Sequence, residues 1–188
     1  QKQNARRAYK IRLCGHLRRY KKIVKKTYII YNKLYLRREF MSSVKTISEL
    51  MLSFGSMSNK KIQKICYYAY SWYLTLYGEQ LAPFQFEAWV HGPVSRELYH
   101  YYKSYGWSDI PQYHGLVMVD NEMAAFARKI WTLYGSYSAD ELEQMSHKEY
   151  PWQAARGTCR YYESSDTLLD DDDIIAYFSK NKDFFISA

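Results

Sequence analysis

Residues 58–78 read SNKKIQKICYYAYSWYLTLYG, and this stretch decides the fold. Its apolar residues recur every three or four positions, which is the period of one face of an α-helix. Ser58 or Asn59 can cap the start of such a helix, and Gly78 suits its C-terminal end. We therefore predict a long helix at the centre of the domain, whose inward face carries Ile62, Ile65, Cys66, Ala69, Tyr73 and Leu76.

The segments on either side of this helix also carry structural signals. Residues 43–55 repeat the helical spacing and predict a short amphipathic helix that ends at Gly55. Residues 79–94 contain Pro83, Gly92 and Pro93 around an alternating apolar stretch, so we predict a loop with one short extended segment. After this loop, Ser95 is predicted to cap a helix that ends at Gly106.

Downstream, the pattern predicts one short strand and several helices. The strand is expected at residues 116–119, followed by a helix over residues 121–134 that Gly135 closes. Ser138 and Glu141 have the spacing of a capping box for a helix over residues 142–147. Pro151 suits the first turn of another helix, and the acidic residues 170–173 suit the start of the last one. The expected fold is a single, mainly α domain with a minor β element, with an α+β fold as the alternative.

The charge of the chain is unevenly distributed. The formal net charge is +8, which taken whole would favour a nucleic-acid or membrane-surface partner. Residues 1–40, however, carry +13, whereas residues 41–188 hold 13 basic and 18 acidic residues and carry −5. We therefore divide the chain into a basic N-terminal extension or upstream leader at 1–40 and a domain at 41–188.

The basic extension has two interpretations. Clustered Lys and Arg with intervening tyrosines can bind RNA or DNA, whereas a charge run can equally be a disordered or artefactual leader. The residues just before Met41, Arg37 to Glu39, can all be written with purine-only codons, as a translated ribosome-binding site would be. We expect translation to start at Met41, so that nucleic acid is a partner only if residues 1–40 are native.

Composition narrows the class of protein. Hydrophobic residues make up 47% and aromatic residues 18% of the chain, which excludes a disordered protein. Three widely spaced cysteines, Cys14, Cys66 and Cys159, argue against a secreted disulfide framework and favour a cytoplasmic protein. No apolar run approaches the length of a transmembrane helix, so no membrane partner is expected.

No catalytic or metal-binding motif is present in the sequence. GxSxG, P-loop, HExxH and CxxC patterns are all missing, and Cys66 falls on the apolar face of the long helix, where a core thiol is expected. His147 with Glu149, and Glu87 with His91, are candidate acid and base pairs, but structural roles are favoured for both. We expect no enzyme activity, no cofactor and no metal.

Three segments together resemble the Panacea domain, the family of SocA-like antitoxins and phage-associated GepA-like proteins. The run IQKICYYAYSWYLTLYG resembles the family's first helix, EAWVHGPVSRELYHYYKSYG resembles its EAW-x-x-GPV segment, and SHKEYPW matches its later His and Pro-Trp positions. The likeness spans residues 43–178, and family members begin near the position of Met41. The candidate toxin-binding or signature residues are Gln63, Lys64, Tyr67, Tyr68, Trp72, Glu87, Trp89, His91, Gly92, Pro93, Arg96, Tyr101, His147, Pro151 and Trp152.

The resemblance implies a helical antitoxin that suppresses a cognate toxin, encoded by a neighbouring gene, by direct protein contact. Most rings of the long helix are expected in the core, and the groove is expected to be lined by a few of them and by the loop from Glu87 to Arg96. The charge of −5 would favour association with a basic toxin. A cellular protease that receives the toxin from this protein is an alternative partner, and DNA or RNA binding through residues 1–40 is a further alternative.

Overall fold

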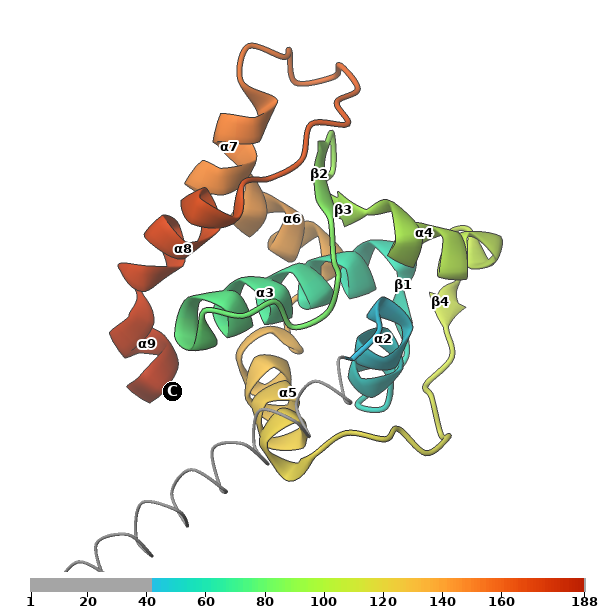
Figure 1. The fold of residues 1–188 in the computed structure, drawn as a ribbon. Coiled ribbons are helices and arrows are strands. Elements are labelled where there is room, and N and C mark those ends of the chain that lie inside the picture. The colour runs from blue at the N-terminus through green and yellow to red at the C-terminus, as the bar shows by residue number, and fades with distance from the viewer. Residues whose placement is uncertain (1–41, 188) are drawn as a thin grey trace, which may run out of the picture. The chain divides into compact units, whose positions relative to one another are not determined.

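The computed structural model describes residues 42–187, and the sequence predictions for residues 1–40 lie outside this range. The described residues form one unit in which helices dominate and two small two-stranded sheets are added (Figure 1). The mainly α fold with a minor β element is therefore confirmed. The elements are α2 (Val44–Leu52), β1 (Met57–Ser58), α3 (Asn59–Tyr77), β2 (Phe86–Trp89), β3 (Gly92–Ser95), α4 (Arg96–Tyr102), the 3-10 helix η1 (Lys103–Tyr105), β4 (Asp109–Ile110), α5 (Asn121–Tyr134), α6 (Ala139–His147), α7 (Tyr150–Arg156), α8 (Asp171–Ser179) and α9 (Lys182–Ser187).

Helix α3 is the centre of the fold, and every other element packs around it or against its neighbours (Figure 1). Ser58 caps its start by accepting a hydrogen bond from the Lys61 amide, and Gly78 ends it in the left-handed conformation at φ 68°. Because α2, α4, α5, α6, α8 and β3 all contact α3, its burial extends beyond one face. The side chains buried all round it include Ile62, Ile65, Cys66, Tyr67, Tyr68, Ala69, Tyr70, Trp72 and Leu74.

Several predicted helix ends are confirmed by their hydrogen bonds. Ser138 and Glu141 form the expected capping box at the start of α6. Asp170 accepts hydrogen bonds from backbone amides at the start of α8, and Pro151 lies in the first turn of α7. These ends depend on residues within one helical turn of each other, which is why the sequence alone indicates them.

Four predicted details are wrong. The helix expected to be the last, α8, is followed by a further helix, α9. Residues 79–94 contain a β-hairpin instead of one extended segment, because β2 pairs with β3 from Phe86 opposite Ser95 to Trp89 opposite Gly92. The strand expected at residues 116–119 does not form; the short strand lies earlier, where β4 pairs with β1. Ser95 occupies the N-cap position of α4, but its side chain makes no capping bond; Gln63 bonds to its backbone amide and carbonyl.

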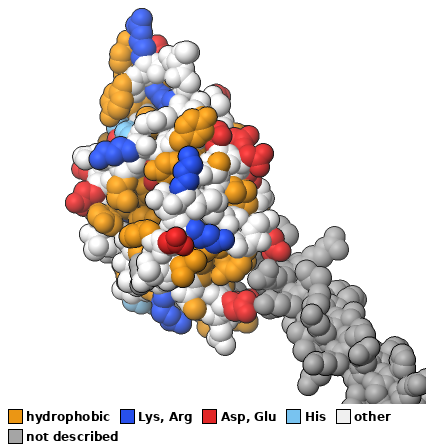
Figure 2. Space-filling model, turned by 90° about the vertical axis from the view of Figure 1, so that its left-hand side faces the viewer, with side chains coloured by type: hydrophobic (Ala, Val, Ile, Leu, Met, Phe, Trp, Pro, Cys, Tyr) orange, Lys and Arg blue, Asp and Glu red, His pale blue; other side chains and the backbone are white. Residues whose placement is uncertain are grey.

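Among residues 42–187, no helix is both long enough and apolar enough to cross a membrane. The face carrying α8 and α9, seen in Figure 2, shows basic and acidic side chains scattered among hydrophobic ones. This mixed pattern is typical of a surface in contact with water.

Because α3 lies in the core, we predict that the thiol of Cys66 on this helix reacts slowly in the folded protein. Cys66 is fully buried and burial raises the pKa of its thiol, whereas Cys159 is exposed. In a Cys14→Ser variant, we expect a thiol reagent such as DTNB to modify one cysteine rapidly in the native protein and the second only after denaturation. Equal rates for both thiols in the native protein would contradict this packing of α3.

Candidate functional site

The β2–β3 hairpin is attached to α3 by side chains that bind its backbone. Gln63 donates from its amide nitrogen to the Ser95 carbonyl at 3.2 Å and accepts from the Ser95 amide at 2.8 Å. Next to it, Lys64 donates to the Pro93 carbonyl at 2.9 Å. Both side chains are buried. The outer edge of β3 thus bonds to polar groups of α3, much as it would bond to a third strand.

The other edge of the hairpin is bound from the C-terminal part of the chain. The Ala88 amide donates to the Thr167 carbonyl, and the Leu169 amide donates to the Phe86 carbonyl, both at 2.8 Å. From α7, the Trp152 indole donates to the Trp89 carbonyl at 3.0 Å. The hairpin is therefore fixed on both edges before any partner binds.

Arg156 connects α7 to both the hairpin and the loop beside it. Its guanidinium donates to the Ala88 carbonyl at 3.3 Å and to the Glu163 carbonyl at 2.7 Å. It also donates to the carbonyls of Arg160 and Tyr161. One buried arginine thus fixes the loop that faces the hairpin tip.

One face of the hairpin carries a polar and aromatic cluster, made of Glu87 and Trp89 of β2 and of Arg96 at the start of α4. Glu87 accepts two hydrogen bonds from the Arg96 guanidinium, at 2.9 and 2.7 Å, and one from the Trp89 indole at 2.7 Å. The bonds from Arg96 and Trp89 outweigh the opposing effect of burial and lower the pKa of Glu87. Arg96 also lies over the Trp89 ring, 5.9 Å from its centroid. The side chain of His91 is 70% exposed, so a partner can reach the tip.

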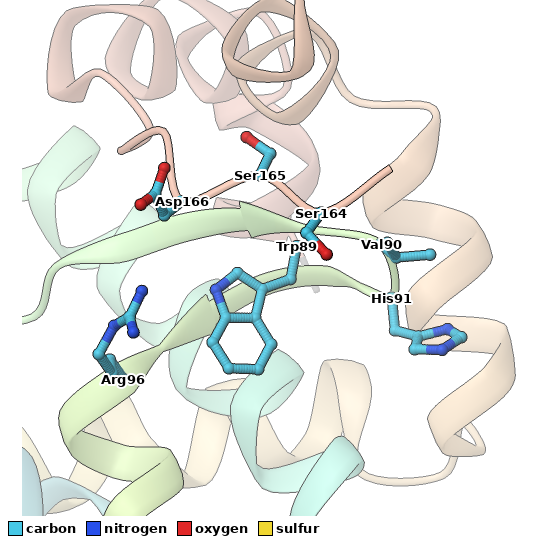
Figure 3. Close-up of a pocket in the computed structure, with 7 residues that line it drawn as sticks. All are labelled: Trp89, Val90, His91, Arg96, Ser164, Ser165 and Asp166. Carbon is cyan, nitrogen blue, oxygen red and sulfur yellow. The ribbon is translucent and has the colours of Figure 1, made fainter. Parts of the chain in front are cut away.

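Two hollows flank this tip and share Trp89 and His91. The first, which we call the loop hollow, has a volume of about 630 Å³ and lies between the hairpin and the loop at residues 164–166. Figure 3 shows Trp89 projecting between Arg96 and His91 in this hollow. The second, which we call the α3 groove, has a volume of about 610 Å³ and is lined by Ser58, Asn59, Lys60, Gln63, Lys64, Trp89, His91, Val94, Tyr99, Lys103, Gly106, Trp107, Ala139 and Asp140.

A cluster of charged side chains lies beneath the tip. Lys60 forms ion pairs with Asp140, at 2.7 Å, and with Glu143. His91 Nδ1 lies 3.0 Å from a carboxylate oxygen of Glu143. Burial alone would raise the pKa of Glu143, but hydrogen bonds from Lys60 and His91 outweigh it and the pKa is lowered. For Lys64, burial lowers the pKa to about 7, although the Glu143 charge acts in the opposite direction.

The two acid and base pairs considered from the sequence are not formed. The Glu149 carboxylate accepts hydrogen bonds from the hydroxyls of Tyr67 and Tyr68, at 3.0 and 2.8 Å, and burial raises its pKa to about 7. His147 stacks on Trp152 with 4.1 Å between ring centroids, and burial lowers its pKa. Glu87 and His91 bind different partners. Among the described residues, no group of three or more His, Cys, Asp or Glu side chains is placed to hold a metal ion.

The structure divides the predicted site residues into two classes. The buried class supports the hairpin and core. Four rings of the long helix, Tyr67, Tyr68, Tyr70 and Trp72, belong to the core, as expected for most of these rings, and none of the four lines the α3 groove. The aromatic rings that line the α3 groove belong to Trp89, Tyr99 and Trp107. Buried candidates are Gln63, Lys64, Tyr67, Tyr68, Trp72, Gly92, Pro93, Pro151 and Trp152, with Glu87 and His147 largely covered, whereas His91, Arg96 and Tyr101 are exposed and Trp89 is partly so.

Sequence reasoning missed several residues of the site. Trp107 is fully exposed beside the groove, but a lone tryptophan after a glycine carries no pattern that separates it from a core residue. Glu143, which links Lys60 and His91, precedes His147 by one helical turn. That spacing was available in the sequence as a signal of neighbouring side chains.

Comparison with family models supports the resemblance that the sequence shows. Residues 62–153 match the model of the family described as antitoxin SocA-like, Panacea domain. The matched range runs from α3 to α7 and includes the whole hairpin. A search of curated proteins and a search of solved structures each gave no significant match.

Gly92 tests the close packing of the hairpin on α3. Its φ is 90°, and an added Cβ would lie 2.8 Å from Lys64 Cε and 2.7 Å from Ser146 Oγ. We expect Gly92→Ala to lower the free energy of unfolding by about 3 kcal/mol in urea denaturation, because strain and steric overlap add. The control is Gly78→Ala, where φ is 68° but no atom lies within 4 Å, with an expected loss of about 1 kcal/mol. Equal losses would show that Lys64 and Ser146 give way freely.

The raised pKa of Glu149 predicts how stability depends on pH. Because the folded state binds this proton more tightly, with a pKa of about 7 against an ordinary 4.5, the stabilisation is complete below 4.5 and is lost as the pH rises through 7. Glu149→Gln cannot ionise. Relative to the wild type, we expect its unfolding free energy to increase by about 3 kcal/mol between pH 5 and pH 8.

Thermal or urea unfolding at several pH values measures this difference. Exposed Gln144→Ala, which changes no ionisable group, serves as the control, for which the difference from the wild type should stay flat. A Glu149→Gln difference that does not change with pH would mean that the carboxylate is already ionised at pH 5.

Proposed function

Residues 62–153 form a SocA-like Panacea domain, and from this premise we propose that the protein is an antitoxin that neutralises a cognate toxin by direct binding. In this function the chain covers a surface of the toxin and catalyses no reaction. It places the contact on the hairpin tip and the two hollows beside it.

The single observation that carries the proposal is the pre-formed hairpin tip. Gln63, Lys64 and Trp152 bind the hairpin backbone, so little conformational entropy remains to be lost when a partner docks. Beside the tip, the surface exposes Arg96, the first residue of α4, and part of Trp89, and tryptophan and arginine are over-represented among residues that dominate binding energy. A fixed surface of this composition favours recognition of a protein.

The exposure of Trp107 supports the same location. Its side chain is 100% exposed, although leaving such a large apolar ring in water is unfavourable in the free protein. It lies on the rim of the α3 groove, together with Tyr99. A partner that covers this rim would remove both rings from water.

Coexpression with the product of the neighbouring gene tests the proposal. We expect the wild-type chain to restore growth of cells that make the toxin, and the double variant Trp89→Ala, Trp107→Ala to bind the toxin about 30-fold more weakly and fail to restore growth. Phe184→Ala on α9, which truncates another exposed ring, is the matched control and should restore growth fully. Equal toxicity with and without the wild-type chain would refute the antitoxin function.

The amount of toxin in the same cells identifies the mode of neutralisation. If the toxin stays at a constant level while growth is restored, the protein acts by covering it. If the toxin disappears and inhibition of cellular proteases brings it back, the protein delivers the toxin for degradation.

A further inference from the structure

The α3 groove differs in charge from the domain to which it belongs. Residues 41–188 carry a net charge of −5, whereas the groove lining includes three lysines and one aspartate. Lys60 is already neutralised by Asp140 and Glu143, so the available positive charge comes mainly from exposed Lys103 on the rim. Lys103 therefore offers one accessible positive charge to an acidic ligand at the rim of the groove.

The N-terminal end of α3 adds to this positive potential. Ser58, Asn59 and Lys60 all line the groove, and the first turn of a helix carries partial positive charge on its backbone amides. A carboxylate in the groove would face this helix end. The helix has 19 residues, so its end carries the full effect of aligned peptide dipoles.

Asn59 provides a separate indication that a polar chain binds here. The residue is only 8% exposed, and its side-chain oxygen is a buried acceptor with no hydrogen-bond partner within the described structure. A buried acceptor without a donor costs roughly 1–3 kcal/mol. A backbone N–H of an extended peptide in the groove satisfies this oxygen if the Asn59 side chain, which lines the groove, turns toward it.

Part of the groove lining is aromatic. Trp89 and Tyr99 pack together with 5.5 Å between ring centroids, and the fully exposed Trp107 lies on the rim beyond them. Such a lining favours an apolar side chain. The groove therefore combines an aromatic lining, a positive end and one unsatisfied acceptor.

We infer that the α3 groove binds an extended acidic segment of the toxin, with an apolar side chain against Trp89, Tyr99 and Trp107 and a carboxylate facing Lys103 and the start of α3. This inference rests on the proposed function and specifies the chemistry of the partner. The overall charge of −5 can still attract a basic surface elsewhere on the same toxin, because the groove acts only on the segment that enters it.

Indole signals in NMR spectra of the full-length, ¹⁵N-labelled chain test the inference. The probe is a blocked ten-residue peptide with one tryptophan beside two aspartates, and the control peptide has two asparagines instead. We expect the aspartate peptide to shift the indole N–H signals of Trp89 and Trp107 at millimolar concentration. The signal of Trp72, whose indole is buried and donates to Tyr134, should not move. The asparagine peptide should bind about tenfold more weakly.

Two matched variants separate the groove from general electrostatics. Lys103→Glu should weaken binding of the aspartate peptide about tenfold, whereas Lys182→Glu, which makes the same charge change on α9, should leave it unchanged. Equal binding of the two peptides, no shift of Trp89 and Trp107, or equal effects of the two variants would overturn the inference. Adenosine monophosphate is a second probe. Stronger shifts of the same signals by this nucleotide would overturn it in favour of a nucleotide site.

The peptide experiment and the growth experiment can fail independently of each other. If the wild-type chain restores growth but the aspartate peptide does not bind, the toxin docks elsewhere and only the inference fails. If the peptide binds as expected but the wild-type chain does not restore growth, the groove recognises acidic segments and the antitoxin function fails.

Discussion

The attachment of the β2–β3 hairpin to α3 through Gln63 and Lys64 is the interaction on which the rest of the structure depends. A two-stranded hairpin is marginally stable on its own, because one edge of each strand remains unpaired. Here the Gln63 amide satisfies both backbone groups of Ser95, and Lys64 bonds to Pro93. Since α3 is also the core of the domain, the hairpin inherits its rigidity.

Two buried ionisable groups accompany this attachment, and each carries a desolvation cost. Lys64 lies under β3, and Glu149 lies at the start of α7 between the hydroxyls of Tyr67 and Tyr68. Apolar residues of the same size would cost less to bury. What the polar groups supply is direction, because hydrogen bonds fix the hairpin and α7 in one register relative to α3. Trp152 and Arg156 on α7 then bond to the other edge of the hairpin.

The sequence pattern indicates the residues that hold the hairpin in place better than it indicates the residues that line the α3 groove. Gln63, Lys64, Gly92 and Trp152 were recognised as signature positions, and their roles lie in supporting the hairpin. The sequence does not indicate the groove wall formed by Tyr99, Lys103 and Trp107, because nothing in their spacing separates exposed rings from core ones. Exposure decides between these roles, and it depends on which neighbouring elements cover a side chain.

The sequence by itself determined the helices from α2 to α8, most of their capped ends and the position of α3 in the core, but it did not indicate α9. These features depend on residues within a few turns of each other, such as Ser138 with Glu141, so local spacing is sufficient to specify them. Only the tertiary structure decided that residues 86–95 form a hairpin and that a groove opens beside it. Those features depend on contacts such as Gln63 to Ser95 and Tyr67 to Glu149, which join residues 32 and 82 positions apart. No local pattern encodes such pairs, because their distance is set by how the intervening helices pack.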